Sequence, residues 1–318
     1  MDDTTSARSD GTRDAVAAQP RTVSVTAQPA GPMVGRRPRW LVAAVVALLV
    51  LAGAGALISQ RHHSGWQLSW SEDFNGSSLD QSKWTAENES TFGNGNLELA
   101  CLMDRRQNIV VAGGQLSLRA VREPAPVKCG EDDTRFPQGR SYTSAMISTD
   151  GKASWHQGRF EIRAKLPLAA GSSKGLWPAF WMRPVSGPAD GELDVMEAIG
   201  TADPQDPEAG SVHQTLWYDE KKTYPKQSHV AAVAGGPASG FHTYAVEWRA
   251  GQLRWFVDNQ LTFQRDRSTA PWIDKAFAGD FFIRLNLAVG GTFPGEPEAA
   301  TRFPADLTVD WVKVYQWR

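Results

Sequence analysis

The sequence predicts an all-β fold, either a sandwich or a barrel of many short strands. From Trp66 onwards, short runs of alternating apolar and polar residues recur, and each run is bounded by Gly, Pro, Asn or Asp. The chain holds 29 Gly and 19 Pro, a level that suits frequent turns between short strands. The same region lacks long helical periodicity. We therefore expect one all-β domain over residues 66–318, a size within the usual range for such domains.

Individual strands follow from alternation with a period of two, because successive side chains of a strand point to opposite faces of its sheet. The clearest runs are residues 115–120, 158–166, 242–248, 253–258 and 307–315. Residues 257–261 carry Asp-Asn between two such runs and predict a hairpin turn. Residues 272–277 predict one short helix.

The N-terminal part of the chain has a different composition. Residues 1–40 contain few large apolar residues and are expected to form a disordered cytoplasmic arm. Residues 41–58 form an uninterrupted apolar run that predicts a membrane-spanning or signal helix, and residues 59–65 link it to the domain. The arginines at 36, 37 and 39 favour a cytoplasmic N-terminus.

Either type of N-terminal helix would export the domain. A single-pass anchor would hold it outside the cell membrane, whereas cleavage at the small residues 52–56 would secrete it. Exported proteins meet oxidising conditions, so Cys101 and Cys129 are expected to form one disulfide or to remain two buried thiols. Their spacing fits no zinc pattern.

Charge and aromatic content limit the class of partner. The formal net charge is −2, which gives no electrostatic basis for binding nucleic acid. The chain contains 13 Trp, more than a core of this size needs, which indicates exposed stacking platforms.

The stretch 191–197 places Glu192, Asp194 and Glu197 among apolar residues. In a regular strand Glu192 and Asp194 share a face, and Glu197 points to the other face. One extra residue at Val195-Met196, a β-bulge, would bring all three carboxylates into one groove. It would also turn Leu193 and one of the two bulge residues toward the core. The alternative is an edge strand with a solvated acidic face.

Paired carboxylates in a Trp-lined groove suit the cleavage of a glycosidic bond without a cofactor. In a retaining mechanism, one carboxylate attacks the anomeric carbon and the other protonates the leaving oxygen across about 5–5.5 Å. Glu192 and Glu197 have Cα atoms roughly 13 Å apart in the bulged strand, a gap that two long side chains can close. Asp194 lies between them, where it can bond the nucleophile and raise the pKa of its neighbour.

This stretch resembles the signature of glycoside hydrolase family 16, in the bulged form of the laminarinase and agarase branches. Similar stretches run in order along the chain from about residue 66 to the C-terminus. They include residues 70–76, 98–99, 104–105, 142–144, 158–167, 175–182, 285–291 and 309–315.

The resemblance implies a β jelly-roll whose concave face forms a polysaccharide cleft. It implies that Glu192 is the nucleophile, Asp194 its assisting partner and Glu197 the general acid/base. The expected substrate is a laminarin-type glucan cleaved at internal β-1,3 linkages by a monomer. The alternatives are another polysaccharide such as a galactan, transfer of glycan instead of hydrolysis, and a carbohydrate-binding module without activity.

The resemblance also suggests residues that bind sugar. Trp181 and Trp177 lie four apart and can stack on sugar rings, and the alternative is that they are core residues. Asn286 and Asn96 match family positions near the donor-side sugar.

The resemblance is weaker on the acceptor side. His213 resembles a histidine that binds substrate there, but Trp217 stands where a second histidine is usual. The resemblance further implies a structural calcium ion near Asp73 and Asp310, whose carboxylates would suit it. Ordinary surface charge is the alternative reading of those two residues.

Overall fold

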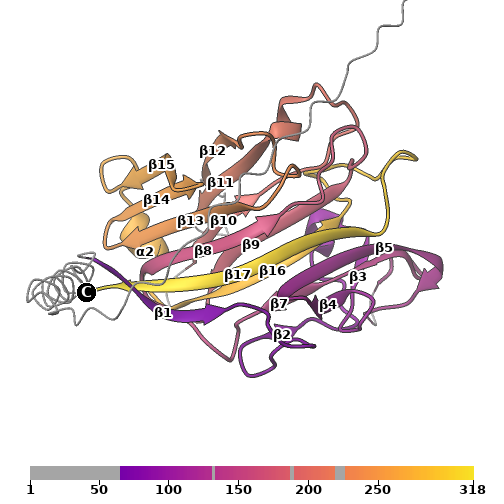
Figure 1. Ribbon diagram of the computed structural model, residues 1–318, viewed down its shortest axis with the longest axis horizontal. Helices are drawn as coiled ribbons and strands as arrows, with labels where there is room; N and C mark the ends of the chain where they lie inside the picture. The colour runs from indigo at the N-terminus through magenta and orange to yellow at the C-terminus, as the bar shows by residue number, and fades with distance from the viewer. Residues whose placement is uncertain (1–64, 131–132, 187–189, 219–225) are drawn as a thin grey trace, which may run out of the picture. The chain divides into compact units, whose positions relative to one another are not determined.

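The computed structural model describes residues 65–318, apart from 131–132, 187–189 and 219–225 (Figure 1). The N-terminal arm and the apolar run 41–58 lie outside the described residues, so their roles stay predictions. Within the part of the chain that the structure describes, every helix is too short or too polar to cross a membrane.

The larger of two β-sheets has the strand order β15-β14-β13-β8-β17-β5-β6-β3, with β1 paired to β17 and β4 paired to β5. Among the described strands of this sheet, only β3 and β6 pair in parallel. The strands are β1 (Trp66–Glu72), β3 (Ala100–Leu102), β4 (Ile109–Ala112), β5 (Gln115–Val127), β6 (Arg140–Ser144), β8 (Gly158–Lys165), β13 (His242–Arg249), β14 (Gln252–Val257), β15 (Gln260–Asp266) and β17 (Ala305–Trp317).

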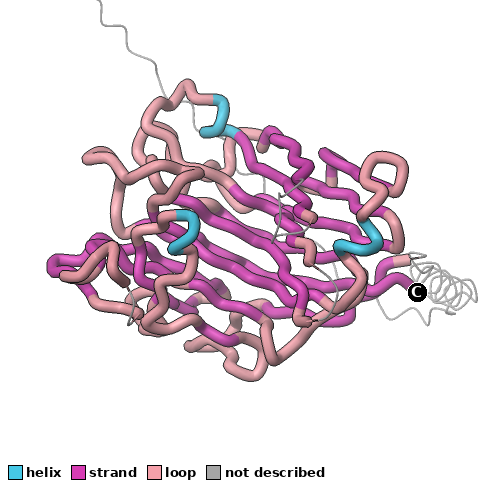
Figure 2. Tube along the Cα trace, turned by 180° about the vertical axis from the view of Figure 1, so that it is seen from behind, coloured by secondary structure: helices cyan, strands magenta, loops and turns pink. Residues whose placement is uncertain are grey.

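The smaller sheet is antiparallel and has the strand order β12-β11-β10-β9-β16-β7-β2. Its strands are β2 (Thr85–Ala86), β7 (Met146–Ser148), β9 (Leu176–Pro184), β10 (Glu192–Glu197), β11 (Ser211–Trp217), β12 (Lys226–Ala232) and β16 (Phe281–Val289). Helical segments are short turns between strands, as Figure 2 shows from behind. They are η1 (Asn94–Asn96), η2 (Pro207–Gly210) and α2 (Ile273–Ala276).

The predicted all-β fold and its predicted strands are confirmed. Each of the five clearest alternating runs lies in a strand to within one residue at its C-terminal end, namely β5, β8, β13, β14 or β17. The hairpin turn is confirmed between β14 and β15, where Asp258 and Asn259 have φ values of 48° and 64°. Both values lie in the left-handed region that a type I′ turn requires. The short helix is confirmed as α2.

The core lies between the apolar faces of the two sheets. On β8, Phe160 and Ile162 are fully buried, and on β9 Phe180 and Met182 are fully buried in the same cluster. Burial of each such side chain stabilises the fold by about 1.5–3 kcal/mol. The opposite face of the smaller sheet is left to carry polar and aromatic residues.

The bulge predicted in β10 is present. Leu193 pairs with Met182 and Asp194 with Trp181, but the register then shifts so that Met196 pairs with Phe180. The expectation that only one of Val195 and Met196 faces the core is wrong, because both are fully buried in it. Two consecutive residues oppose one partner position at the bulge, and the core accommodates both side chains.

Two glycines bracket β10. A Cβ on Gly191 would lie 2.7 Å from the Ala276 carbonyl oxygen, and one on Gly200 would lie 1.7 Å from the Ser173 carbonyl oxygen. Any side chain at either position would therefore push backbone apart. The chain is in direct backbone contact on both sides of this strand.

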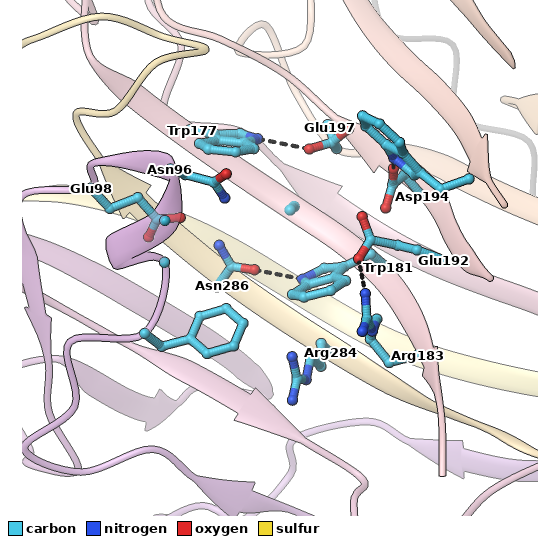
Figure 3. A pocket seen from close by; sticks show the side chains of 15 residues that line it. Asn96, Glu98, Trp177, Trp181, Arg183, Glu192, Asp194, Glu197, Arg284 and Asn286 are labelled. Carbon is cyan, nitrogen blue, oxygen red and sulfur yellow. Dashed lines mark hydrogen bonds and ion pairs between the residues drawn. The ribbon is translucent and has the colours of Figure 1, made fainter. Parts of the chain in front are cut away.

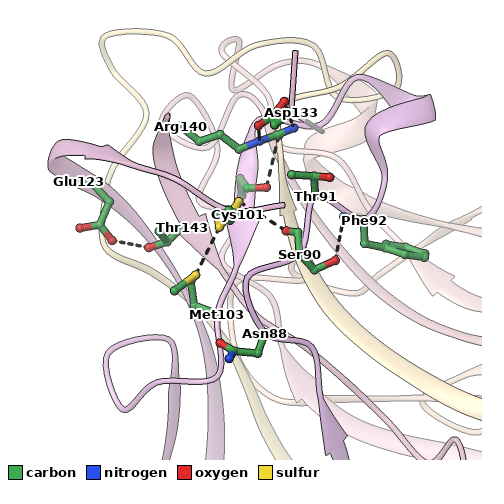
Figure 4. The surroundings of a disulfide bond; sticks show 12 residues. Asn88, Ser90, Thr91, Phe92, Cys101, Met103, Glu123, Asp133, Arg140 and Thr143 are labelled. Atoms are coloured by element: carbon green, nitrogen blue, oxygen red, sulfur yellow. Dashed lines mark hydrogen bonds and ion pairs between the residues drawn. A yellow bond between two sulfur atoms is a disulfide. The ribbon is translucent and has the colours of Figure 1, made fainter. Parts of the chain in front are cut away.

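A disulfide joins Cys101 of β3 to Cys129, with their Cα atoms 5.9 Å apart. Figure 4 shows Arg140 and Asp133 beside it, joined by an ion pair. The Arg140 guanidinium also donates to the Glu98 carbonyl at 2.7 Å. The disulfide and this arginine together fix the loop that carries η1.

Candidate active site

A cavity of 590 Å³ opens on the face of the smaller sheet that lies away from the core. Strands β9, β10, β11 and β16 supply its floor, and the loop around η1 supplies one wall (Figure 3). The side chains that line it are mostly aromatic, acidic or amide. They include Asn96, Glu98, Trp177, Trp181, Glu192, Asp194, Glu197, Trp217 and Asn286.

The strand register arranges this floor in rows that cross the sheet. Asp194 pairs with Trp181, and Trp181 pairs in turn with Arg284. Beyond the bulge, Glu197 pairs with Ala179, which pairs with Asn286. The bulge therefore brings Glu197 onto the same face as Asp194, as the parity of the sequence predicts.

Asp194 is the most deeply buried of the three carboxylates, with 3% of its surface exposed. Burial raises its pKa well above the ordinary value, and the neighbouring Glu197 and Glu192 raise it further. The indole N–H of Trp217 donates to Asp194 Oδ2 at 2.9 Å and opposes this shift. Asp194 also shares a side-chain hydrogen bond with Glu197. Burial and the two neighbouring carboxyls therefore favour the protonated form of Asp194.

Glu197 is tuned in a similar way. Burial raises its pKa from 4.5 to about 7, and the charge of Glu192 adds to the shift. The indole N–H of Trp177 donates to Glu197 Oε1 at 3.0 Å and holds the carboxyl in place. A carboxyl of this kind can donate a proton near neutral pH.

Glu192 has a different environment. The Arg183 guanidinium donates to its Oε2 at 2.8 Å and forms an ion pair with it. The floor therefore places a carboxylate beside a cation at one end of β10 and a proton-holding carboxyl at the other. Glycosidases commonly use a pair of carboxyls with opposite roles, one ionised and one protonated.

The family model named glycosyl hydrolases family 16 matches residues 80–313. The chain belongs to this family. It is a glycoside hydrolase.

Individual family-16 proteins support this membership along most of the domain. A beta-glucanase from Rhodothermus marinus is 39% identical over 290 residues, which cover 85% of this chain and 93% of that protein. A glucan endo-1,3-beta-glucosidase A1 from Niallia circulans is 34% identical over 80% of this chain and 38% of its own length. The crystal structure of the Rhodothermus marinus laminarinase superimposes with a TM-score of 0.67 at 35% identity, covering 81% of this chain and all of that one.

The remaining predicted sugar-binding residues are distributed unevenly in this family-16 cleft. Trp181 and Asn286 line it and are joined by a 2.7 Å hydrogen bond from the indole N–H to the amide oxygen. Asn96 lines the opposite wall on η1. The alternative that Trp177 and Trp181 are core residues is wrong, because both line the cleft and are half-buried.

His213 lies beside the cleft and not in its lining. It pairs with Glu197 across β10 and β11, but its Nε2 atom bonds the Glu208 carboxylate at 2.6 Å. Its ring packs edge-on against Phe293, which also contacts Trp177. Trp217, four residues further along, lines the cleft and bonds Asp194.

The carboxylates expected to hold calcium do not form a ligand cluster. Asp310 accepts a 2.5 Å hydrogen bond from Arg163, and Asp73 is exposed at the end of β1. Among the described residues, no group of three or more His, Cys, Asp or Glu side chains could hold a metal ion. Calcium binding by these two side chains stays a prediction.

Three charged residues of the cleft are absent from the sequence-based prediction: Glu98, Arg183 and Arg284. Burial raises the pKa of Glu98 to about 7, while a hydrogen bond from Asn96 and the charge of Arg140 oppose the shift. Arg183 and Arg284 interrupt apolar strands at positions that share a face with the three carboxyls of β10. That alternation was the signal that could have revealed the two arginines.

Proposed function

We propose that this chain is an endo-acting glycosidase that hydrolyses internal β-1,3 linkages of a laminarin-type glucan with retention of configuration. The names of the Niallia circulans and Rhodothermus marinus proteins support the substrate and the linkage. The single observation that carries the mechanism is the contrast between two carboxyls on one face of β10. Glu192 pairs with Arg183, whereas Glu197 has a pKa of about 7.

In the first step, the Glu192 carboxylate attacks the anomeric carbon of the donor-side sugar. The glycosidic C–O bond breaks as Glu197 gives its proton to the leaving oxygen. The product of this step is a glycosyl ester on Glu192 and a shortened glucan with a free hydroxyl.

In the second step, the Glu197 carboxylate takes a proton from water while the water oxygen attacks the anomeric carbon. The ester bond to Glu192 breaks and the protonated Glu197 is restored. Two inversions at one carbon give net retention.

Asp194 and two tryptophans keep these groups in position. Asp194 shares a side-chain hydrogen bond with Glu197, and the indole N–H of Trp217 donates to Asp194 Oδ2. Trp177 directs Glu197 Oε1. The indole rings present flat surfaces to the C–H faces of sugar rings.

The test is hydrolysis by the purified full chain of laminarin, mixed-linkage glucan, galactan and agarose. Release of reducing ends from laminarin is expected, with the β-anomer appearing first by proton NMR. Cleavage of galactan or agarose in place of laminarin would overturn the substrate. Initial release of the α-anomer would overturn retention.

We also propose that the domain acts outside the cytoplasm, held by residues 41–58 or released after cleavage near 52–56. The disulfide supports this location, because disulfides persist in oxidising compartments. N-terminal sequencing of the protein from cell and medium fractions tests it. Mature protein confined to the cytoplasm would contradict the proposal.

A further inference from the structure

Arg284 lies in the floor of the cleft near Asn286, which the family resemblance places beside the donor-side sugar. It stands two residues before Asn286 on β16, and the period of two places both side chains on the same face. Its partner in β9 is Trp181. Figure 3 shows Arg284 beside Arg183, with no interaction drawn to it.

The Arg284 guanidinium is enclosed but not paired. Three aromatic rings surround it, with centroids 4.8 Å from its Cζ atom for Phe92 and 5.0 Å for both Trp181 and Phe282. Among the described residues it makes no hydrogen bond or ion pair, and its buried Nε has no partner. By contrast, Arg183 in the neighbouring strand is neutralised by an ion pair. A buried, uncompensated cation is costly unless a ligand supplies the opposite charge.

The charges that line the cleft below pH 7 also favour an anionic ligand. Burial raises the pKa of three of its four lining carboxyls and so favours their neutral forms: Glu98, Asp194 and Glu197. Glu192 is offset by Arg183, which leaves Arg284 as the uncompensated charge of the lining. The carboxylates of Glu87, Asp150 and Glu192 act on Arg284 from beyond ion-pair distance, and the positive charge of Arg183 opposes them.

We propose that Arg284 binds an anionic oxygen group, a carboxylate or a sulfate ester, carried by a donor-side sugar of the polysaccharide. This inference rests on the proposed function and narrows its substrate to a charged glucan. A guanidinium offers parallel N–H donors that match the two oxygens of such a group. A neutral hydroxyl would fill the hydrogen-bonding positions but leave the charge uncompensated. The aromatic rings fix the guanidinium in advance, which limits the entropy lost on binding.

The experiment compares three glucans of matched length: neutral laminarin, laminarin oxidised at C6 to carboxylates, and laminarin carrying sulfate esters. The wild-type chain is assayed at about 0.15 M salt, where long-range charge effects are screened. We expect kcat/KM on one anionic glucan to exceed that on laminarin by about tenfold, which corresponds to about 1.4 kcal/mol. The anionic glucan with the higher kcat/KM shows whether the bound group is a carboxylate or a sulfate ester. Equal or lower kcat/KM on both anionic glucans would overturn the inference.

Variants distinguish the effect of Arg284 on the anionic preference from the effect of the protein's net charge. Arg284→Met should reduce the anionic preference to about onefold, and Arg284→Lys should retain part of it. Arg267→Met is the matched control, because Arg267 is exposed, pairs with Asp274 and lies outside the cleft lining. It changes the net charge equally and should keep the preference. Unchanged preference in Arg284→Met would contradict the assignment.

A binding measurement distinguishes failure of this inference from failure of the proposed function. Calorimetric titration of Glu197→Gln with the same three glucans reads the anionic preference without hydrolysis. If wild-type enzyme cleaves none of them, the proposed function fails, and the titration still decides the role of Arg284. Equal affinity of Glu197→Gln for neutral and anionic glucans, with Arg284 present or replaced by Met, would rule out the proposed role of Arg284.

Discussion

The indole N–H of Trp255 donates a hydrogen bond to the backbone carbonyl of Asp194 at 2.9 Å. Trp255 belongs to β14 of the larger sheet, whereas Asp194 stands at the bulge of β10 in the smaller sheet. A bulge interrupts the ladder of hydrogen bonds between strands and leaves backbone groups in need of partners. The core side of the molecule therefore supplies a donor to the strand that carries the proposed catalytic carboxylates.

Trp255→Phe should lower both stability and turnover. The ring volume is largely kept, but the buried carbonyl loses its donor, which costs about 1–3 kcal/mol of unfolding free energy. We expect kcat on laminarin to fall while KM changes little, because the bulge positions the carboxylates and does not bind sugar. Urea unfolding and steady-state kinetics measure the two effects.

Trp248→Phe is the matched control for this prediction. Trp248 is also buried, at 3% exposure, and packs against Phe281, but among the described residues its ring contacts no aromatic ring of β10. It should lose stability without a selective loss of kcat. A similar fall in kcat in both variants would show that the Trp255 bond has no specific role.

Substitution of the catalytic carboxylates should abolish hydrolysis without unfolding the domain. Glu197→Gln removes the general acid and should lower kcat on laminarin by a factor on the order of 10²–10⁴. Glu192→Gln removes the nucleophile and should leave no measurable glycosyl ester. Melting temperatures within a few degrees of wild type are the control. Full activity in either variant would disprove its assigned role.

The pH dependence of kcat/KM should show a limb near the pKa of Glu197. The pKa is about 7, and the protonated form is the active one, so kcat/KM should fall as the pH rises above that value. Trp177 donates a hydrogen bond that favours the ionised form of Glu197. Trp177→Phe should therefore move the limb to higher pH. A limb that moves to lower pH would contradict this account.

Glu98 should make the domain less stable in alkaline solution. Burial raises its pKa from 4.5 to about 7, so the folded state binds this proton more tightly than the unfolded state. Its contribution to stability is complete below about pH 4.5 and is lost as the pH rises to 7, by roughly 3 kcal/mol.

Glu98→Gln should consequently gain stability relative to wild type between pH 4.5 and pH 8. Urea unfolding at both pH values measures the change, and the titrations of other groups cancel in the difference. Glu296→Gln, at an exposed position, is the control and should show no such gain. A difference in unfolding free energy between Glu98→Gln and wild type that stays constant from pH 4.5 to pH 8 would contradict this prediction.

Removal of the disulfide should destabilise the domain and loosen one wall of the cleft. Cys101 and Cys129 are 28 residues apart, and closure of a loop of that length is worth about 3–4 kcal/mol in the chain-entropy description. The double variant Cys101→Ala/Cys129→Ala should show this loss in urea and a higher KM for laminarin. An unchanged KM would mean that Arg140 alone fixes the η1 loop.

Local pattern was sufficient for much of the fold and for the centre of the site. Alternation located the strands, and the parity of Glu192, Asp194 and Glu197 predicted the bulge. Both signals lie within a few consecutive residues. The burial of both Val195 and Met196 was not predictable, because it depends on how the opposite sheet fills the space.

Residues whose roles depend on pairing between distant strands were not found from sequence. Arg183 and Arg284 are 101 positions apart along the chain and share the cleft floor only because β9 and β16 are neighbours. Glu98 reaches the cleft through the η1 loop, which follows no repeating pattern. His213 hydrogen-bonds Glu208, five residues earlier, and its contact with substrate stays a prediction.

The glycines on either side of β10 determine what must move during the reaction. Backbone contacts at Gly191 and Gly200 fix both ends of the strand, and Trp255 holds its middle. The spacing of the catalytic carboxylates is thus set before any glucan arrives, and little motion of this strand remains available to adjust it. The change of shape on the way to the transition state must therefore occur in the sugar ring, with the energy for its distortion supplied by the neighbouring sugars bound along the cleft.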